Sequence, residues 1–179
     1  MEKKNRALFL DRDGIVIDDV SYPYKKEDLH IREEIIPHLK WAQAKGFKIV
    51  IVTNQSGIAR GYFTLQQYRS FEALVNQALA ERDVFVDAVY FCPFHEKGSV
   101  EPYNVESEER KPAPGMFFKA RDDLNLSLED SFMVGDKFSD NIDYPGLRSL
   151  ILESPYTRGK SGLTYESFDL LFREIRNGI

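Results

Sequence analysis

The feature that most constrains the fold of this chain is a regular alternation of short apolar runs with longer stretches of helical periodicity. Five runs rich in β-branched and aromatic residues are bounded by turn residues, which is typical of buried strands; they are Ala7–Leu10, Lys48–Thr53, Ala88–Cys92, Ser131–Val134 and Ser149–Leu152. Helical patterns separate or follow them, at about Glu33–Lys45, Leu65–Arg82 and Gly115–Leu124, with a shorter one after Phe138 and a last one near Tyr165–Arg176. This alternation predicts an α/β fold, a Rossmann-like three-layer αβα sandwich with a central parallel sheet.

The alternation is interrupted between Pro93 and Lys111, where two prolines, a glycine and the acidic stretch Glu106–Glu109 show little periodicity. A length of 179 residues favours one domain, since domains commonly have about 100–150 residues. We therefore predict a single domain over residues 1–179 with a loop inserted at about 93–111 and no large cap domain. Loops this long inside a compact domain are usually functional or mobile.

The net charge of −5 argues against a general binder of nucleic acid or of membrane surfaces, because phosphate-rich partners favour a basic face. The charged start of the chain lacks the apolar stretch of a signal peptide, and no run reaches the ~20 apolar residues of a membrane helix. Cys92 is the only cysteine, so no internal disulfide can form. We expect a cytoplasmic protein and a monomer.

Two aspartates directly follow the first predicted strand, in the segment Asp11-Arg12-Asp13-Gly14. A carboxylate can attack phosphorus to form an aspartyl phosphate, and a second nearby carboxyl can protonate the leaving oxygen. Aspartates are also common in turns without any such chemistry, because they favour turn conformations. Alone, this segment is a weak indication of phosphoryl transfer.

Three later segments offer complementary side chains. Thr53-Asn54-Gln55-Ser56 ends the second predicted strand with hydroxyl and amide groups that can donate to a phosphoryl oxygen. Arg110-Lys111 precedes the third helix and supplies cations suited to phosphate. The segment from Asp136 to Asp140 follows the fourth strand with carboxylates, the hard oxygen ligands that Mg²⁺ prefers. Each has an ordinary structural interpretation, but ligands bind at the carboxyl ends of parallel strands, so together they predict one phosphoryl-transfer site.

The four segments resemble the four motifs of the haloacid dehalogenase superfamily of phosphatases. The longer strings Thr53 to Gly61, Arg110 to Met116 and Val134 to Lys137 are similar to the D-glycero-D-manno-heptose 1,7-bisphosphate phosphatases, and histidinol-phosphate phosphatases share much of that pattern. The resemblance covers about residues 6 to 140. It implies a Mg²⁺-dependent phosphatase acting on a small phosphorylated metabolite, with heptose bisphosphate on the route to bacterial cell-surface polysaccharide as the leading substrate.

The resemblance also implies roles for individual residues. Asp11 would be the nucleophile, and Asp13 the acid and then the base. Mg²⁺ would be held by Asp11, the backbone carbonyl of Asp13 and Asp136, while Asp140 would orient Lys137 or a metal-bound water. Thr53 and Lys111 would hold the phosphoryl group. The substrate pocket would be lined by Asp19, Tyr22, Asn54, Gln55, Ser56, Arg110 and Lys137.

Many of these phosphatases bind zinc in the inserted loop through a Cys-x-His pair and a Cys-x-Cys pair. This chain keeps Cys92, but Phe94, Ser107 and Glu109 stand at the other ligand positions. Structural zinc requires four thiolate or imidazole ligands, so we predict no zinc. Without a metal the loop needs other contacts, and we expect a small apolar cluster of Phe91, Phe94 and Tyr103; His95 we interpret as a solvated residue.

Two further points bear on the substrate. The heptose enzymes usually have Asp-His-Gly-Tyr where this chain has Asp19-Val20-Ser21-Tyr22, and this stretch helps to choose the substrate. The exact metabolite is therefore open, and histidinol phosphate or a different small sugar phosphate is the alternative substrate. A domain that binds phosphorylated ligands without turnover is disfavoured, because Asp11, Asp13, Lys111 and Asp136 are all present. The basic segment from Tyr156 to Lys160 is either a mobile loop near the site or plain surface, and we favour surface.

Overall fold

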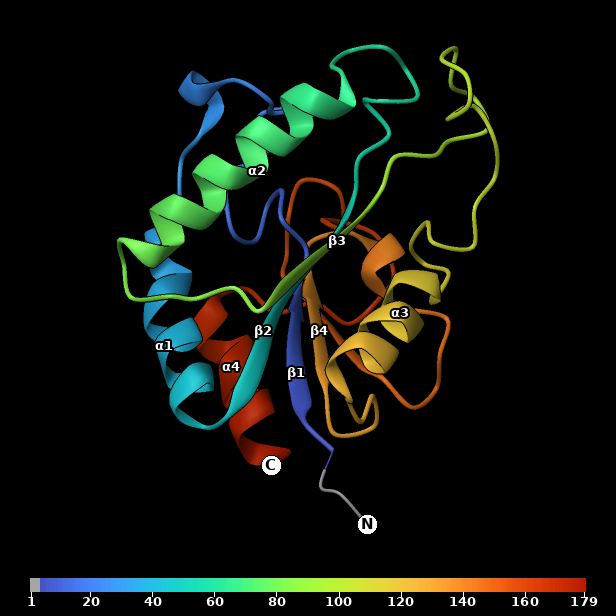
Figure 1. Cartoon of the computed structure of the whole chain (residues 1–179). Helices are drawn as coiled ribbons and strands as arrows, with labels where there is room; N and C mark the ends of the chain where they lie inside the picture. The colour runs from blue at the N-terminus through green and yellow to red at the C-terminus, as the bar shows by residue number, and fades with distance from the viewer. Residues whose placement is uncertain (1–3) are drawn as a thin grey trace.

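The computed structural model describes residues 4–179, and its centre is a five-stranded sheet in which every neighbouring pair is parallel (Figure 1). The strands lie in the order β3-β2-β1-β4-β5. Their bounds are β1 Arg6–Leu10, β2 Phe47–Asn54, β3 Ala88–Cys92, β4 Phe132–Gly135 and β5 Arg148–Ile151. The α/β prediction and its parallel sheet are confirmed.

The helices are α1 Ile36–Ala44, α2 Leu65–Ala80, α3 Gly115–Leu124 and α4 Phe168–Asn177. The predicted short helix after Phe138 is wrong, since only a 3₁₀ turn is present at Phe138–Asp140 and Pro145 follows soon after it. The last helix begins at Phe168 because Ser167 caps it, its hydroxyl accepting from the Leu170 amide.

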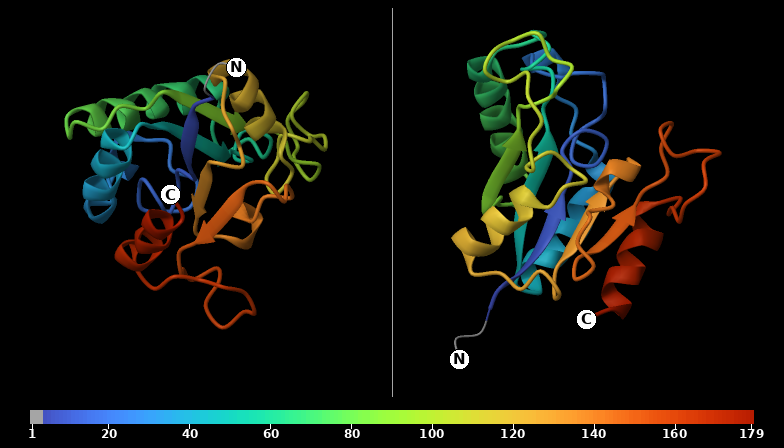
Figure 2. Two further views of the ribbon diagram at one scale, coloured as in Figure 1. Left: turned by 90° about the horizontal axis from the view of Figure 1, so that it is seen from below. Right: turned by 90° about the vertical axis from the view of Figure 1, so that its right-hand side faces the viewer.

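The two faces of the sheet are covered by different helices, as the side-chain alternation of the strands requires. Leu8 and Leu10 of β1 lie in one apolar cluster with residues of α1, α2 and α4, whereas Phe9 lies in another with α3. The Phe9 and Phe117 rings meet edge to face with centroids 4.9 Å apart. Figure 2 shows the resulting three layers, and the predicted αβα sandwich is confirmed.

The strand order places a topological switch at the centre of the sheet. From β1 the chain continues to β2 and β3 on one side, and then crosses to β4 and β5 on the other. In open sheets of this kind ligands bind beyond the carboxyl ends of the strands at the switch. The chain after β1 and the loop between β3 and α3 both lie beyond that edge, at the top of Figure 1. No separate cap domain is present within residues 4–179.

The inserted loop, residues 93–111, contains no helix or strand and is held by aromatic and backbone contacts. Phe94 packs against Tyr103 with ring centroids 5.9 Å apart, while Phe91 contacts Tyr68 at 4.3 Å. The predicted cluster is thus confirmed for Phe94 and Tyr103, and Phe91 and Tyr103 both pack against a neighbouring cluster around Tyr68. Among the described helices, none combines the length and the apolar character needed to cross a bilayer.

Candidate active site

A cavity of about 270 Å³ opens at the carboxyl edge of the sheet. It brings together residues from all four predicted segments with residues of the loop after β1 and the turn after β5. Its lining is Asp11, Asp13, Asp19, Ser21, Tyr22, Asn54, Gln55, Ser56, Arg110, Lys111, Lys137, Ser139, Asp140 and Tyr156. Of the predicted site residues, Thr53 and Asp136 do not line it; both are buried, at the ends of β2 and β4.

Asp11 follows β1 directly and has one oxygen engaged and one free. Its Oδ1 accepts from the Arg12 amide at 2.9 Å and lies 3.0 Å from the Lys111 ammonium. No described residue donates a hydrogen bond to Oδ2. A buried carboxylate held on one side by a cation, with its other oxygen unengaged, has the arrangement that a nucleophile requires.

Lys111 is the buried cation of the site. Its Nζ donates to Asp140 Oδ1 at 2.6 Å and to the Val52 carbonyl at 2.9 Å, beside the contact with Asp11. Burial alone would lower the pKa of Lys111, but the charges of Asp11 and Asp140 outweigh it and raise the pKa, so the side chain stays charged. Asn54 fixes the backbone here, because its amide group both accepts from the Lys111 N–H at 3.0 Å and donates to the Lys111 carbonyl at 3.1 Å.

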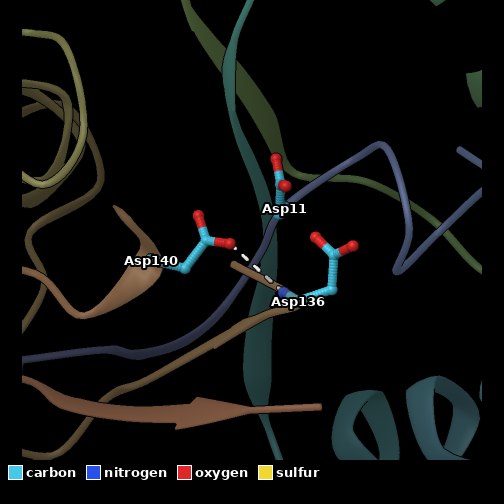
Figure 3. Close-up of side chains that lie close together, drawn as sticks. All are labelled: Asp11, Asp136 and Asp140. Atoms are coloured by element: carbon cyan, nitrogen blue, oxygen red, sulfur yellow. Dashed lines mark hydrogen bonds between the residues drawn. The ribbon is translucent and has the colours of Figure 1, made fainter. Parts of the chain in front are cut away.

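Asp11, Asp136 and Asp140 form the acidic cluster of the site (Figure 3). One carboxylate oxygen from each lies within 4.8 Å of the others, and all three residues are buried. Asp136 Oδ1 has no hydrogen-bond partner, although the Lys137 ammonium is 3.5 Å away. Burial, reinforced by the charge of Asp11, raises the pKa of Asp136 to about 7.

These observations fit a divalent cation. An unpaired buried carboxylate oxygen is costly unless a cation or proton satisfies it, and clustered hard oxygen atoms are the donor set that Mg²⁺ prefers. The backbone carbonyl of Asp13 receives no hydrogen bond within residues 4–179 and stays available as a further ligand. Gly14 has φ +90 and leaves room for this cluster, since a Cβ there would lie 2.2 Å from Asp136 Oδ2.

Asp140 is engaged through both of its oxygens. While Oδ1 accepts from Lys111, Oδ2 accepts from the backbone amides of Asp136 at 3.2 Å and Lys137 at 3.1 Å. Its carboxylate therefore contacts the Lys111 ammonium, whereas it meets Lys137 only at the backbone. Gly135 makes this possible, because a Cβ there would lie 2.2 Å from the Asp140 carboxylate.

Asp13 is held by two neighbours. Arg12 Nε donates to its Oδ1 at 2.7 Å and Gln55 Nε2 donates to its Oδ2 at 3.1 Å. The same Gln55 nitrogen lies 2.8 Å from the Thr53 hydroxyl, so in this arrangement Thr53 faces Gln55. The side chain of Asp13 remains partly exposed to the cavity.

Arg12 and Glu72 form a buried support that the sequence patterns did not reveal. Arg12 is fully buried, and its Nη1 donates to Glu72 Oε2 of α2 at 3.1 Å. Burial would lower the pKa of Arg12, but the charges of Asp13 and Glu72 outweigh burial and raise that pKa. The pKa of Glu72 is raised, mainly by its burial. A signal was available, since Glu72 lies on the apolar stripe of α2 between Tyr68 and Val75.

One wall of the cavity is formed by Asp19, Lys137 and Tyr156. The Lys137 ammonium lies 3.0 Å from Asp19 Oδ2 and 4.5 Å from the centre of the Tyr156 ring. The interpretation of the segment Tyr156 to Lys160 as surface is therefore wrong for Tyr156, which lines the cavity. Tyr22 also lines the cavity, and its ring meets Tyr62 edge to face with centroids 4.7 Å apart. Ser21 and Tyr22 adopt left-handed φ values of 59 and 58.

Arg110 lines the cavity without an anionic partner among the described residues. Its Nη1 is buried and makes no hydrogen bond, and no ion pair to Arg110 occurs within residues 4–179. Burial lowers the pKa of Arg110, and the charge of Arg60 acts in the same direction. An anionic group of a ligand would offset both effects.

The residues at the zinc positions do not fit a structural zinc ion. Cys92 is buried with its Sγ directed to the Phe94 carbonyl at 3.9 Å, and the Phe94 ring packs on Tyr103. The only group of three or more metal-ligating side chains in the described part of the chain is the acidic cluster. One thiol in an aromatic environment lacks the tetrahedral ligand set that zinc requires.

We expect purified protein to contain zinc far below one atom per chain, because the loop is ordered by Phe94 and Tyr103. Elemental analysis by mass spectrometry checks this, on protein expressed in zinc-supplemented medium. As a control, a zinc chelator should leave the melting temperature unchanged. Stoichiometric zinc, or a chelator-induced drop in melting temperature, would show that the loop holds the metal with a ligand set other than the family positions.

Comparisons with known proteins identify relatives along most of the chain. The profile of the family described as polynucleotide kinase 3 phosphatase matches residues 7–168. The D-glycero-beta-D-manno-heptose-1,7-bisphosphate 7-phosphatase of Escherichia coli strain K12 is 42% identical over 140 residues, which is 78% of this chain and 73% of that protein. The protein of the same name from Vibrio cholerae is 40% identical over 134 residues, 75% of this chain and 72% of the relative.

Solved structures show the same fold. A HAD-like phosphatase from Mesorhizobium loti superposes with a TM-score of 0.86 and 35% identity, covering 98% of this chain and 86% of the other. The D,D-heptose 1.7-bisphosphate phosphatase from B. bronchiseptica, solved with magnesium and phosphate, superposes with a TM-score of 0.75 and 21% identity, covering 97% and 99%. The second likeness is one of fold.

Proposed function

This chain belongs to the polynucleotide kinase 3 phosphatase family and is a phosphatase of the haloacid dehalogenase superfamily, and from that premise we propose that it removes the 7-phosphate of D-glycero-β-D-manno-heptose 1,7-bisphosphate. The substrate proposal is supported by relatives of that name at 40–43% identity over about three quarters of the chain. The chemical proposal is carried by one observation, the unengaged oxygen of Asp11 beside the buried Lys111 and the acidic cluster.

We propose two successive displacements at phosphorus. First, Asp11 Oδ2 attacks the 7-phosphate, the bond from phosphorus to the sugar oxygen breaks, and Asp13 gives that oxygen its proton. Water then attacks the aspartyl phosphate, Asp13 takes a proton from the water, and the bond from phosphorus to Asp11 breaks. One water is consumed, heptose 1-phosphate and inorganic phosphate are released, and both aspartates return to their starting state.

The surrounding residues support these steps through charge and position. Lys111 would contact the oxygens of the transferring phosphoryl group, since its ammonium already lies beside Asp11. Arg12 and Gln55 would hold Asp13 in place for proton transfer. Thr53, which faces Gln55, would donate to the phosphoryl group after its hydroxyl turns.

Mg²⁺ is the proposed cofactor, and Asp11, Asp136 and the Asp13 carbonyl would hold it. Asp140, the third member of the acidic cluster, would lie beside these ligands without binding the ion directly. When bound, it would offset the repulsion between the Asp11 carboxylate and the anionic phosphoryl group. The choice of Mg²⁺ is supported by the all-oxygen donor set. The relative from B. bronchiseptica was solved with magnesium and phosphate.

Recognition of the second phosphate would fall to the cations around the cavity. Arg110 lacks an anionic partner, and a guanidinium can contact a phosphate through two parallel hydrogen bonds. The alternative substrate, histidinol phosphate, carries a cationic amine and imidazole beyond its phosphate. A desolvated arginine in the cavity lining disfavours such a group, so the sugar bisphosphate is the better fit.

The test is phosphate release from a panel of substrates at matched concentrations. The panel contains the heptose bisphosphate, fructose 1,6-bisphosphate, histidinol phosphate and a 3′-phosphorylated oligonucleotide, each with Mg²⁺ and then with a chelator. We expect the highest kcat/KM with the heptose bisphosphate, loss of turnover in chelator, and recovery when Mg²⁺ is returned in excess. A higher kcat/KM for histidinol phosphate or the oligonucleotide would show that the proposed substrate is wrong. Turnover unaffected by the chelator would show that the proposed Mg²⁺ is not required.

A further inference from the structure

Tyr156 contributes the one aromatic side chain of the cavity wall that carries Lys137. It lies in the turn after β5, outside the four predicted segments, and is 42% exposed. Its ring faces the Lys137 ammonium at 4.5 Å from the ring centroid, within the range of a cation–π interaction. Asp19 is the other partner of Lys137, with its Oδ2 3.0 Å from the ammonium.

The turn that carries Tyr156 is tied to Asp136 of the acidic cluster. Ser154 Oγ donates to the Asp136 carbonyl at 2.6 Å, and the Tyr156 amide donates back to Ser154 Oγ at 3.1 Å. Thr157 closes the turn, since its Oγ1 accepts from the Ser154 amide at 2.9 Å. Ser154 and Thr157 are buried, so the position of Tyr156 is fixed relative to Asp136 by buried hydrogen bonds.

This wall lies beside the phosphoryl centre without being part of it. Lys137 is 3.5 Å from Asp136 Oδ1, while its shorter ion pair is with Asp19 at 3.0 Å. Tyr156 has no contact with Asp11 or Lys111 among the hydrogen bonds and ion pairs of the described residues. A ligand phosphate bound at Asp11 would therefore present the group beyond it to the wall.

We propose that Tyr156 determines specificity by holding Lys137 and forming, with Asp19, the wall that binds the sugar beyond the scissile phosphate. The inference rests on the proposed phosphatase function. Tyrosine suits such a role, because one end of the side chain is apolar and the other can hydrogen-bond to hydroxyl groups. As a residue that acts partly through Lys137, it is a positioning residue whose removal should weaken binding of the sugar more than it slows phosphoryl transfer.

The test compares two substrates in the full-length protein with Mg²⁺: the heptose bisphosphate, which reaches the wall, and acetyl phosphate, whose leaving group has no ring. Tyr156→Ala should raise KM for the heptose bisphosphate about tenfold with kcat within about twofold, since it removes a binding contact. With acetyl phosphate, both constants should stay within about twofold of the natural protein. Tyr156→Phe keeps the ring over Lys137 and should recover most of the loss.

A double-mutant cycle with Lys137→Met tests whether Tyr156 acts through Lys137. If it does, the KM effects of the two substitutions are less than additive, because each removes the same contact. Leu163→Ala is the matched control, as Leu163 follows in the same connection, is 77% exposed and does not line the cavity. Leu163→Ala should leave kcat and KM unchanged for both substrates. Melting temperatures monitor folding, and Tyr156→Leu, which keeps the bulk of the side chain, replaces the alanine variant if that variant does not fold.

Two sets of outcomes overturn different claims. If the natural protein hydrolyses neither substrate, the proposed function fails, and the inference fails with it. If the natural protein is active but Tyr156→Ala affects both substrates equally, the residue only maintains structure. If Tyr156→Ala changes the kinetic constants for neither substrate, the wall does not bind the sugar. In each of the last two cases the proposed function stands and only the inference about Tyr156 is overturned.

Discussion

Asp11→Asn should abolish phosphate release, lowering kcat by about 10⁴-fold or more, because an amide oxygen is a poor nucleophile toward phosphorus. The change keeps the shape of the side chain, so the fold should persist. It also removes one negative charge next to Lys111, whose Nζ is 3.0 Å from Asp11 Oδ1, and leaves that lysine paired with Asp140. The measurement is a steady-state assay with the best substrate of the panel, with melting temperature as the check on folding.

Asp143→Asn is the matched control, since Asp143 is an exposed aspartate just beyond the acidic cluster. It should retain the activity of the natural protein. A second readout follows the phosphoryl group itself: acid quench with ³²P-labelled substrate should trap label on the natural protein and none on the Asp11 variant. Unchanged turnover in that variant, or labelling at another residue, would remove Asp11 from the proposed mechanism.

Local periodicity predicted some elements with the bounds that they have in the structure. The strand Ala88–Cys92 and the helix Gly115–Leu124 have the same bounds in the structure as in the prediction. The helix predicted after Phe138 is wrong because the chain leaves the 3₁₀ turn for partners on other elements: the Ile142 amide donates to the hydroxyl of Ser149, on β5, and the Asp143 amide donates to the Pro112 carbonyl. Periodicity cannot indicate a partner that another element supplies.

The same distinction applies to the site. Asp11, Lys111 and Asp140 could be predicted to meet, because each follows a strand end or precedes a helix at one edge of the sheet. The pairing of Arg12 with Glu72 spans 60 residues and depends on how α2 lies over the sheet. Tyr156 carries no motif at all, and only the buried turn after β5 brings it to the cavity.

Lys111→Met should reduce both stability and catalysis. Lys111 is the buried cation between Asp11 and Asp140, with Nζ 3.0 Å and 2.6 Å from their oxygens. Removing it leaves two buried carboxylates without this cation, which costs about 3–5 kcal/mol in the free energy of unfolding when nothing replaces the charge. The loss of a fixed positive charge at the phosphoryl oxygens should lower kcat about 10²–10³-fold. Urea denaturation without Mg²⁺ and steady-state kinetics with Mg²⁺ measure the two effects separately.

A second substitution separates the two roles of Lys111. In Lys111→Met with Asp140→Asn, one of the two unpaired charges is removed, so much of the lost stability should return. Catalysis should not return with it, because the cation that would contact the phosphoryl group is still missing. Asp140→Asn alone is the control, since it leaves Lys111 paired with Asp11. If kcat of the double variant recovered in step with its stability, Lys111 would support the fold without taking part in phosphoryl transfer, and the electrostatic role proposed for it would be wrong.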